Sequence, residues 1–495
     1  MAIAGIDIGT TGCKCSVYSR EGELLNEAYR EYPSWTTDHV LDATLVWENT
    51  KAILKEAAST TEALEAIGVT SFGEALVLLD ENSLPLAPSM LYTHPKGTEQ
   101  CEQLVNHFGQ EYLAYSTGLN PGPMYSIPKL MYFKEQYPEL WSKCRSISLF
   151  GDYIVYMLSG IRQIDYSLAS RTMAFDINRL QWNEEILEYA GTDMGLWPAP
   201  VPIGTPAGTI RKSLAEELGI HEGAIIVSGC HDQVAAAIGT GVCKPGMAVD
   251  GTGTVECITP VFDNNIEREP LHEGSYAIVP FLNNQYVTYA FSFTGGALLK
   301  WYRDKLANME AGFDRDEGGS PYHYFNSKVD TTRPSGLLVL PHFSGAATPY
   351  MDAESRGAII GLTTDTTSTD IYQGLMEGVT YEMLLNMERL MESGIEISTI
   401  RATGGGALST IWLQMKADIL NRPVISLGAA QSGTLGCIML AGVACGIYES
   451  IDEAEEILVH VKETYVPNRE KHKQYMVLYQ KYKKIYGAVK DILTA

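Results

Sequence analysis

Four short stretches of this chain combine residue types that suit the handling of phosphate and the deprotonation of a hydroxyl group. The first reads Asp7-Ile8-Gly9-Thr10-Thr11-Gly12, and Lys14 follows two residues later. A turn of such small residues exposes backbone N–H groups on one side, which suits a phosphate, and Asp7 at the end of a strand could hold magnesium directly or through water. An ordinary hairpin turn carries the same residue types, so this stretch alone leaves both interpretations open.

A second turn of glycine and threonine occurs in the other half of the chain. It reads Asp250-Gly251-Thr252-Gly253-Thr254 and follows an apolar stretch. Two such turns, each heading a separate domain, can hold a polyphosphate from both sides, so the pair favours phosphate binding more than either turn does. Neither turn has the P-loop pattern, no Rossmann glycine pattern follows a strand, and the chain contains no GxSxG nucleophile elbow.

The third stretch is a run of three glycines. Gly404-Gly405-Gly406 follows the apolar strand predicted at Ile400–Thr403 and precedes a helix predicted from Ser409. Three consecutive glycines remove every β-carbon where the backbone must lie flat against something bulky. An adenine or ribose is one candidate for that neighbour, and close packing of the helix on the strand is the other.

The fourth stretch carries the candidate general base. The sequence predicts a buried strand over Ala224–Ser228, a break at Gly229-Cys230, and a helix that His231-Asp232-Gln233 opens. Asp232 would then lie at the tip of a strand, where a carboxylate can accept the proton of an attacking hydroxyl. An Asp at a helix start is also a common N-cap, and the neighbouring His231 and Cys230 are too sparse for a metal site.

The elements that must position these stretches form an α/β pattern. At 495 residues the chain is too long for one core, so we expect two domains, residues 1–240 and 241–495. Strands are predicted at 2–8, 13–19 and 24–32, with a helix from Asp42 to Ala58, and the unit at 3–17 has a weak echo at 247–258. A long helix is predicted between Thr369 and Ser393, and a Lys- and Tyr-rich helix from Arg469 is predicted as a solvated outer face.

Composition excludes several classes of partner. The net charge of −24 argues against nucleic acid and against an anionic membrane surface. The longest apolar stretch, Cys437–Tyr448, is too short to span a bilayer, and the N-terminus lacks the pattern of a signal peptide. The nine cysteines are scattered without a CxxC pair, which is typical of reduced thiols. We therefore expect a cytoplasmic protein.

In their order and spacing, these four stretches resemble the FGGY family of carbohydrate kinases, over nearly the whole chain from Ile3 to Tyr448. Residues 124–136 are similar to the first signature of that family, with Tyr132 where Trp is usual. Residues 357–377 are similar to its second signature, with Gly374 where Ala or Ser is usual. Further matching segments are Gly151-Asp152-Tyr153, residues 165–172 and residues 340–345.

The resemblance implies a fold and a role for each stretch. It implies two actin/hexokinase-like (ribonuclease H-like) α/β domains that flank a nucleotide and sugar cleft, with ATP and Mg²⁺ as cofactors. Asp232 would be the catalytic base, and Asp7 with the turn Gly9–Gly12 and Lys14 would lie at the magnesium and the phosphates. Gly251, Thr252 and Gly253 would form the opposing phosphate clamp. The glycines Gly404, Gly405 and Gly406 would take the adenosine, with Asn421 a weaker candidate there.

The acceptor site is where the chain departs from its relatives. Xylulose kinases resemble one another in a Gln-Met-His-Gly stretch and glycerol kinases in Asn-Gln-Arg-Glu-Thr, whereas here the stretch is Ser71-Phe72-Gly73-Glu74-Ala75. Glu74 is in the right place to bind sugar hydroxyls, but Gly73 replaces the neighbouring Arg or Met. The expected acceptor residues are Glu74, His94, Asp232 and Gln233, of which Gln233 is similar to a substrate-binding glutamine of glycerol kinases.

The resulting hypothesis is phosphorylation of a hydroxyl of a small ketose, such as a pentulose, by ATP. The alternative is a kinase of glycerol or another polyol. Two further interpretations are an enzyme that transfers the phosphoryl group to water and a non-catalytic actin-like nucleotide-binding protein. The retained Asp7, Asp232 and both phosphate turns argue against a scaffold, which has no need of a base. The expected partner is a small sugar or polyol, and the sequence is also compatible with a homodimer.

Overall fold

The chain divides into two compact units. The computed structural model describes residues 1–32, 39–59, 64–307, 321–428 and 432–493. Unit 1 comprises Met1–Cys243, Ala277–Val287 and Gln431–His460, and unit 2 comprises Lys244–Tyr276, Thr288–Ala430 and Val461–Ala495. The first change from unit 1 to unit 2 falls between residues 243 and 244, where the sequence predicts a domain boundary between residues 240 and 241. The later segments Ala277–Val287 and Gln431–His460 also belong to unit 1. None of the described helices combines the length and the apolar composition that a bilayer crossing requires.

Unit 1 is built on a six-stranded sheet with the order β13-β14-β5-β1-β2-β3. The first two strands form an antiparallel hairpin, and β1, β5 and β14 run parallel. The bounds are β1 Ala2–Ile8, β2 Gly12–Ser19, β3 Leu24–Glu31, β5 Leu64–Ser71, β13 Thr205–Thr209 and β14 Ile225–His231. Because parallel strands end at the same sheet edge, β1 and β14 bring the residues that follow them to one edge.

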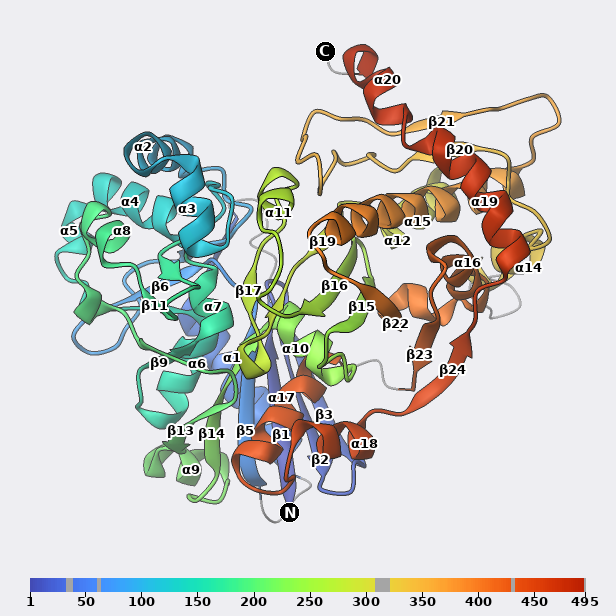
Figure 1. Ribbon diagram of the computed structural model, residues 1–495. Helices are drawn as coiled ribbons and strands as arrows, with labels where there is room; N and C mark the ends of the chain where they lie inside the picture. Colours follow the sequence, from blue (N-terminus) through green and yellow to red (C-terminus); the bar gives the residue numbers. More distant parts are fainter. Residues whose placement is uncertain (33–38, 60–63, 308–320, 429–431, 494–495) are drawn as a thin grey trace. The chain divides into compact units, whose positions relative to one another are not determined.

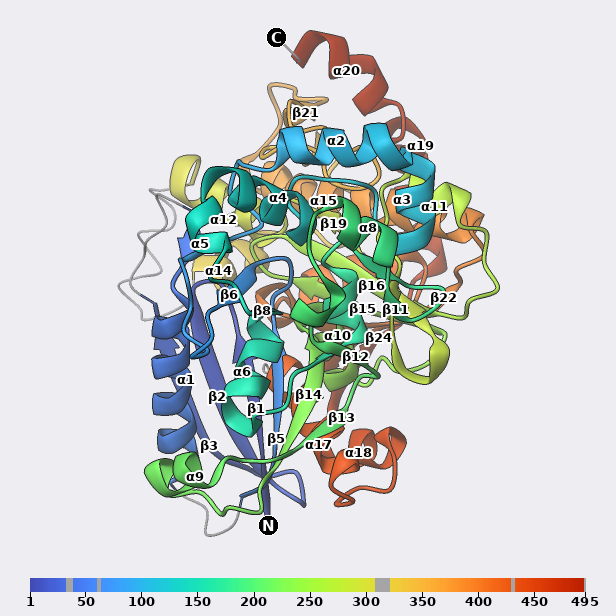
Figure 2. The same cartoon turned by 90° about the vertical axis from the view of Figure 1, so that its left-hand side faces the viewer.

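Helices cover both faces of this sheet (Figure 1; Figure 2). The apolar side chains of α1 (Ala43–Ala58) and α6 (Phe150–Ser159) share one buried core with the even-numbered residues of β1. Asp42 caps α1, as its sequence predicts, by accepting from the Thr44 N–H (2.8 Å). The opposite face is covered by α17 (Ser432–Ala444), where a β-carbon at Gly68 would lie 2.5 Å from the Cys437 carbonyl oxygen. Glycine in β5 thus lets this helix approach the sheet closely.

The helix that carries Asp232 also packs closely on α17. A β-carbon at Gly436 would overlap the carbonyl of Ala235 in α10 (Asp232–Gly239), and one at Gly239 would overlap the carbonyl of Ser432. Small residues therefore bring together two helices that are far apart in the chain. This contact explains why residues near the C-terminus belong to unit 1.

Unit 2 repeats the hairpin arrangement of unit 1. Its strands follow the order β16-β15-β22-β23-β24, and β19 also pairs with β16. The hairpin β15–β16 is antiparallel and β15, β22 and β23 are parallel, so the echo predicted at 247–258 has the same topology as β1–β2 and β5. The bounds are β15 Gly246–Thr252, β16 Glu256–Phe262, β19 Ala290–Ser292, β22 Ile397–Thr403, β23 Val424–Leu427 and β24 Val461–Tyr465.

Four helices of unit 2 matter for the site and its support. They are α12 (Gly296–Lys305), α14 (Pro321–Lys328), α15 (Ser368–Glu392) and α16 (Thr410–Leu420). The long helix α15 agrees with the prediction between Thr369 and Ser393. α16 begins after Ser409, whose hydroxyl caps it by accepting from the Trp412 N–H (3.3 Å). The helix α16 therefore follows the glycine run Gly404–Gly406 directly in the chain.

Two predictions about individual elements are wrong. The strand predicted to break at Gly229-Cys230 continues to His231, because the register moves from Ser228 opposite Val69 to His231 opposite Ser71 and so absorbs one extra residue as a bulge. The helix from Arg469, α19 (Arg469–Tyr482), is not simply a solvated face. Its residues Tyr475, Tyr479 and Tyr482 are buried around Tyr381 of α15. Tyrosine can bury its ring while its hydroxyl keeps a polar partner, as Tyr479 does with Glu388 (2.8 Å).

Candidate functional site

Asp232 begins α10 directly after the end of β14. One carboxylate oxygen accepts from the Gln233 N–H (2.6 Å) and lies 3.2 Å from Nε2 of His231. About a third of its side chain remains exposed, although the surrounding protein removes much of its hydration. Burial, followed by the nearby carboxylates of Asp7 and Glu74, raises the pKa of Asp232 to about 7. A carboxyl group with this pKa can exchange a proton near neutral pH, which suits a general base.

His231 supports Asp232. Burial, with a smaller effect of the Arg171 charge, holds the pKa of His231 well below its usual range, so the ring is neutral. Its backbone N–H donates to Ser167 Oγ (2.8 Å), and that hydroxyl donates to Asp165 Oδ1 (2.5 Å). This chain of hydrogen bonds fixes the end of β14, and therefore the position from which Asp232 projects.

Asp7 and the first turn lie at the end of β1. The Gly9 N–H donates to the Gly12 carbonyl (2.9 Å) and closes the turn, in which Thr11 is exposed. Lys14 stands directly opposite Asp7 in the hairpin register. Burial raises the pKa of Asp7 to about 6, and the charge of Lys14 opposes this rise. Asp7 is thus largely an oxygen anion above that pH, which is the ligand type that Mg²⁺ prefers.

Glu74 is buried and holds an ion pair that the sequence did not indicate. Its Oε1 accepts from Arg171 Nη2 (2.5 Å) and Nε (2.6 Å). Glu74 has a φ of 67°, which is uncommon for a residue with a β-carbon and is often found at functional sites. Gly73 makes the pair possible, since a β-carbon there would lie 2.8 Å from Arg171 Cγ. The missing side chain at position 73 is therefore compensated by a guanidinium from another segment.

The other expected acceptor residues differ in their surroundings. Gln233 is exposed, and His94 is half-buried with its carbonyl accepting from Lys129 Nζ (2.9 Å). Burial lowers the pKa of Lys129 to about 8, against the attraction of Glu74. Sequence reasoning assigned no role to Tyr92, whose pKa is raised by burial and then by the negative charges of Glu74 and Asp232. Tyr92 therefore belongs to the same cluster, and the available signal was its place at the start of Tyr92-Thr93-His94-Pro95-Lys96, where pentulose kinases resemble one another in Trp-Asn-Asp-x-Arg.

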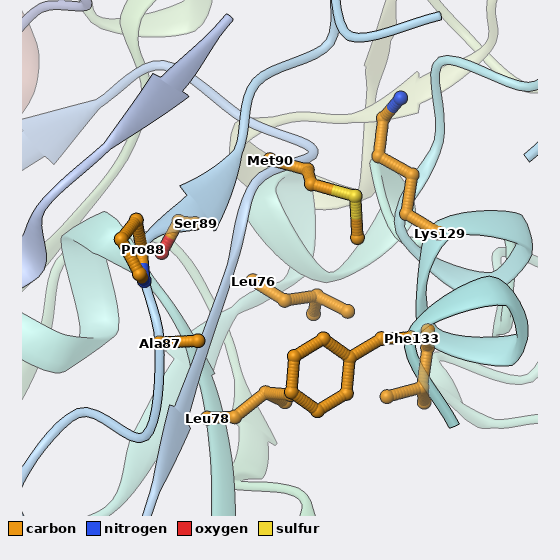
Figure 3. A pocket seen from close by; sticks show the side chains of 9 residues that line it. Leu76, Leu78, Ala87, Pro88, Ser89, Met90, Lys129 and Phe133 are labelled. Carbon is orange, nitrogen blue, oxygen red and sulfur yellow. The ribbon is translucent and has the colours of Figure 1, made fainter. Parts of the chain in front are cut away.

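A small hollow beside Lys129 is not a ligand site. It holds only about 20 Å³, which is about one water molecule, and its lining is mostly apolar. Figure 3 shows the Lys129 ammonium directed away from Leu76, Leu78 and Phe133. The lysine stem contributes apolar packing here, while its charged end serves the segment around His94.

Unit 2 contains a pocket of about 560 Å³, the size of a typical small-molecule site. Of the predicted residues, Thr252, Gly253, Gly405 and Gly406 line it, whereas Gly251 and Gly404 do not. The structure adds α12 and α14 to the lining, which contribute among others Leu299, Lys300, Tyr322, His323 and Asn326. The glycine turn before α12 was the available sequence signal for one of these helices, and nothing in the sequence singled out the other.

The glycine run packs directly on the second phosphate turn. Gly404 has a φ of 81°, and a β-carbon there would lie 2.5 Å from the Thr252 carbonyl oxygen. A β-carbon at Gly406 would overlap the Thr252 side chain. The need for glycine thus arises from protein contacts at these two positions, whereas a β-carbon at Gly405 would meet no described atom within 4 Å. Asn421 is the left-handed C-cap of α16 and is not among the residues that line the pocket.

Each unit therefore offers one part of a group-transfer chemistry. Unit 1 presents a carboxylate that can accept a proton beside a second carboxylate, Asp7, and a Glu–Arg pair that can accept and donate hydrogen bonds. Unit 2 presents a pocket with apolar walls and glycine turns at which backbone N–H groups can contact an anion. Among the described residues no group of three or more His, Cys, Asp or Glu could hold a metal ion. Mg²⁺ needs no such group, because it commonly binds one or two carboxylates together with phosphate oxygens.

Comparisons with known proteins cover both units. Residues 2–239 match the model of the N-terminal domain of the FGGY family of carbohydrate kinases, and residues 253–445 match the model of its C-terminal domain. The chain is 27% identical to a xylulose kinase of Staphylococcus epidermidis over 99% of this chain and 97% of that protein. It is 29% identical to a glycerol kinase of Desulforamulus reducens over 91% of this chain and 91% of that protein.

A solved structure has the same fold. The crystal structure of a ligand-bound xylulose kinase from Lactobacillus acidophilus aligns with a TM-score of 0.89 over 99% of each chain, at 22% sequence identity. At this identity the likeness concerns the fold, and it confirms the two-domain α/β class that the sequence predicts.

Proposed function

The chain belongs to the FGGY family of carbohydrate kinases, and from that premise we propose that it transfers the γ-phosphoryl group of ATP to a hydroxyl of a small ketose or polyol, with Asp232 as the general base. The observation that carries the proposal is the position and protonation of Asp232. It is a partly exposed carboxyl group at a strand end, its pKa is about 7, and two further acidic side chains lie nearby. A structural N-cap has no need of a raised pKa.

In this mechanism unit 1 binds the acceptor. The Glu74 carboxylate accepts hydrogen bonds from hydroxyl groups of the sugar or polyol. Arg171 holds this carboxylate in place through its ion pair. Asp232 accepts the proton of the attacking sugar hydroxyl. The oxygen of that hydroxyl bonds to the γ-phosphorus, and the bond from this phosphorus to the leaving oxygen of ADP breaks. The neutral His231 helps to orient Asp232 without competing for the proton.

Unit 2 binds the nucleotide in the same proposal. The adenosine occupies the pocket of about 560 Å³, and the phosphates lie along the turn at Thr252 and Gly253. Asp7 is the residue that fits a bound Mg²⁺, because it is a carboxylate oxygen ligand at the end of β1. A bound Mg²⁺ would neutralise charge on the phosphates. Lys14 and the N–H groups of the turn Gly9–Gly12 would add positive charge on the same side.

The test is a panel of acceptors with product identification. Purified protein is incubated with Mg-ATP and single ketoses, polyols including glycerol, or sugar acids, and ADP release is coupled to an optical signal. We expect ADP release to depend on one class of acceptor, with a phosphorylated product by mass spectrometry. ADP release that is equal with and without every acceptor would favour transfer to water. Absence of any phosphorylated product across the panel would contradict the kinase proposal.

A further inference from the structure

A lysine of unit 2 is buried directly beneath the turn at Thr252. Lys416 of α16 is 1% exposed, and its ammonium donates to Asp250 Oδ2 (2.6 Å), Glu256 Oε1 (2.5 Å) and Thr252 Oγ1 (2.6 Å). It also lies over the Trp412 ring, 4.8 Å from the centroid. An ammonium has three N–H donors and no acceptor, so every donor of Lys416 is used.

The three acceptors share one face because of strand periodicity. Asp250 and Thr252 are two residues apart in β15, and Glu256 of β16 stands directly opposite Thr252. Side chains at such positions point to the same side of the hairpin. α16 covers this side, and it follows directly on the glycine run that lines the pocket. Lys416 therefore connects the turn at Thr252 with the element that follows Gly404–Gly406.

This network of Lys416, Asp250 and Glu256 is not expected to stabilise the fold. Two buried acidic side chains share one ammonium, Asp250 Oδ1 and Glu256 Oε2 accept from no N–H or hydroxyl donor in the described part of the chain, and the two carboxyl groups interact with each other. Burial, followed by the charge of Asp250, raises the pKa of Glu256, against the attraction of Lys416. Buried ion pairs contribute little net stability, and apolar residues of similar volume are often as stable or more stable. A network that is expensive to bury indicates a functional requirement at this place.

The requirement follows from the chemistry of the Thr252 hydroxyl. Because Lys416 can only donate, Thr252 Oγ1 must accept from it, and the hydroxyl proton must then be donated elsewhere. In the described part of the chain, the hydrogen bond from Lys416 is the one that Thr252 Oγ1 makes, and no protein acceptor for its proton is found there. Thr252 is only 1% exposed but lines the pocket, and Gly404 and Gly406 pack closely against its backbone and its side chain. Because Thr252 lines the pocket, we expect the acceptor for this proton to come from a ligand bound there.

We propose that Lys416 is a positioning residue for the nucleotide: it makes Thr252 Oγ1 an acceptor, so that the Thr252 hydroxyl donates to a phosphate oxygen in the pocket of unit 2. Asp250 and Glu256 hold the ammonium in place and neutralise its charge. The inference rests on the proposed nucleotide site and assigns three residues, Lys416, Asp250 and Glu256, a purpose in it. It concerns the phosphate-bearing part of the ligand and leaves adenosine unaffected.

Calorimetry with ADP and with adenosine tests the proposal without any acceptor. We expect Lys416→Met and Thr252→Val each to weaken binding of Mg-ADP about tenfold, the loss of one hydrogen bond to a charged group, and to leave adenosine binding within about twofold. Thr252→Ser retains the hydroxyl and is the conservative control, with an affinity for ADP close to that of the wild type. The double variant should bind ADP no more weakly than Thr252→Val, because both changes remove the same interaction.

Each outcome decides something. If the wild type binds neither ligand, the nucleotide site itself is wrong. If the wild type binds ADP but Lys416→Met does not alter its affinity, or weakens adenosine equally, the positioning role is refuted. A double variant that binds ADP clearly more weakly than Thr252→Val alone would also refute it. Should Lys416→Met fail to fold, because the acidic pair Asp250 and Glu256 is then buried without its ammonium, the combination Lys416→Met, Asp250→Asn and Glu256→Gln removes every ionisable group of the network. That variant must show the same selective loss of ADP affinity.

Discussion

Replacing Asp232 by Asn should strongly lower kcat and at the same time stabilise the protein. Asn keeps the oxygen that accepts from the Gln233 N–H but cannot take a proton, so we expect kcat to fall by about 100- to 10,000-fold. The folded-state pKa of Asp232 is about 7 against an ordinary value of 3.8. The folded protein therefore holds this proton more tightly than the unfolded chain, and the wild type loses stability as the pH rises from 3.8 to about 7.

The magnitude follows from the same pKa difference. A difference of about three corresponds to roughly 4 kcal/mol for a fully desolvated carboxyl group. Because about a third of the Asp232 side chain is exposed, solvent screening reduces this, and we expect about 1–2 kcal/mol. With an entropy of unfolding of about 1 kcal/mol/K for 495 residues, the gain raises Tm by roughly 1–2 °C at pH 8. At pH 5, where the wild-type carboxyl is mostly protonated in the folded state, the gain should be less than half as large.

The assay is thermal denaturation of both proteins at pH 5 and pH 8, together with acceptor-dependent ADP release. Asp42→Asn is the matched control, since Asp42 is an exposed helix cap at which Asn caps equally well. We expect that control to leave kcat and both Tm values nearly unchanged. A variant at position 232 that retains kcat within tenfold would refute the base, and a Tm gain that does not grow between pH 5 and pH 8 would refute the raised pKa.

Three further outcomes are expected. The kcat/KM of the wild type should fall about tenfold for each pH unit below 7, because only ionised Asp232 accepts the proton; a flat profile between pH 5 and 7 would contradict this. Arg171→Met should lower the free energy of unfolding by about 3–5 kcal/mol in chemical denaturation, because it leaves Glu74 buried without its partner, and it should raise the KM for the sugar or polyol. Adding Glu74→Gln should restore most of that stability, whereas the KM should remain above that of the wild type. Gly404→Ala should cost about 2–4 kcal/mol, given its φ of 81° and a carbonyl oxygen 2.5 Å from the new methyl group, whereas Gly405→Ala should cost less than about 0.5 kcal/mol; equal losses would show that the glycine run is needed for some other reason.

Local patterns in the sequence were enough to find most elements and the ends of the strands that carry the site. The alternation over residues 2–19 predicted the hairpin β1–β2, and Asp42 marked the start of α1, because both signals arise between near neighbours in the chain. The wrong break at Gly229-Cys230 arose because a bulge is defined by its partner strand. The buried tyrosines of α19 were missed for the same reason, since only α15 makes their face an interior one.

By itself the sequence determined the residue types that could do chemistry, namely carboxylates after strands and glycines in turns, because composition and short spacing are written directly in it. Only the tertiary structure decided which charges meet. The pairing of Arg171 with Glu74 and the burial of Lys416 against Asp250 and Glu256 join residues far apart in the chain, and no local pattern encodes a long-range contact. The pKa of Asp232 belongs to the same category, because burial and neighbouring carboxylates set it.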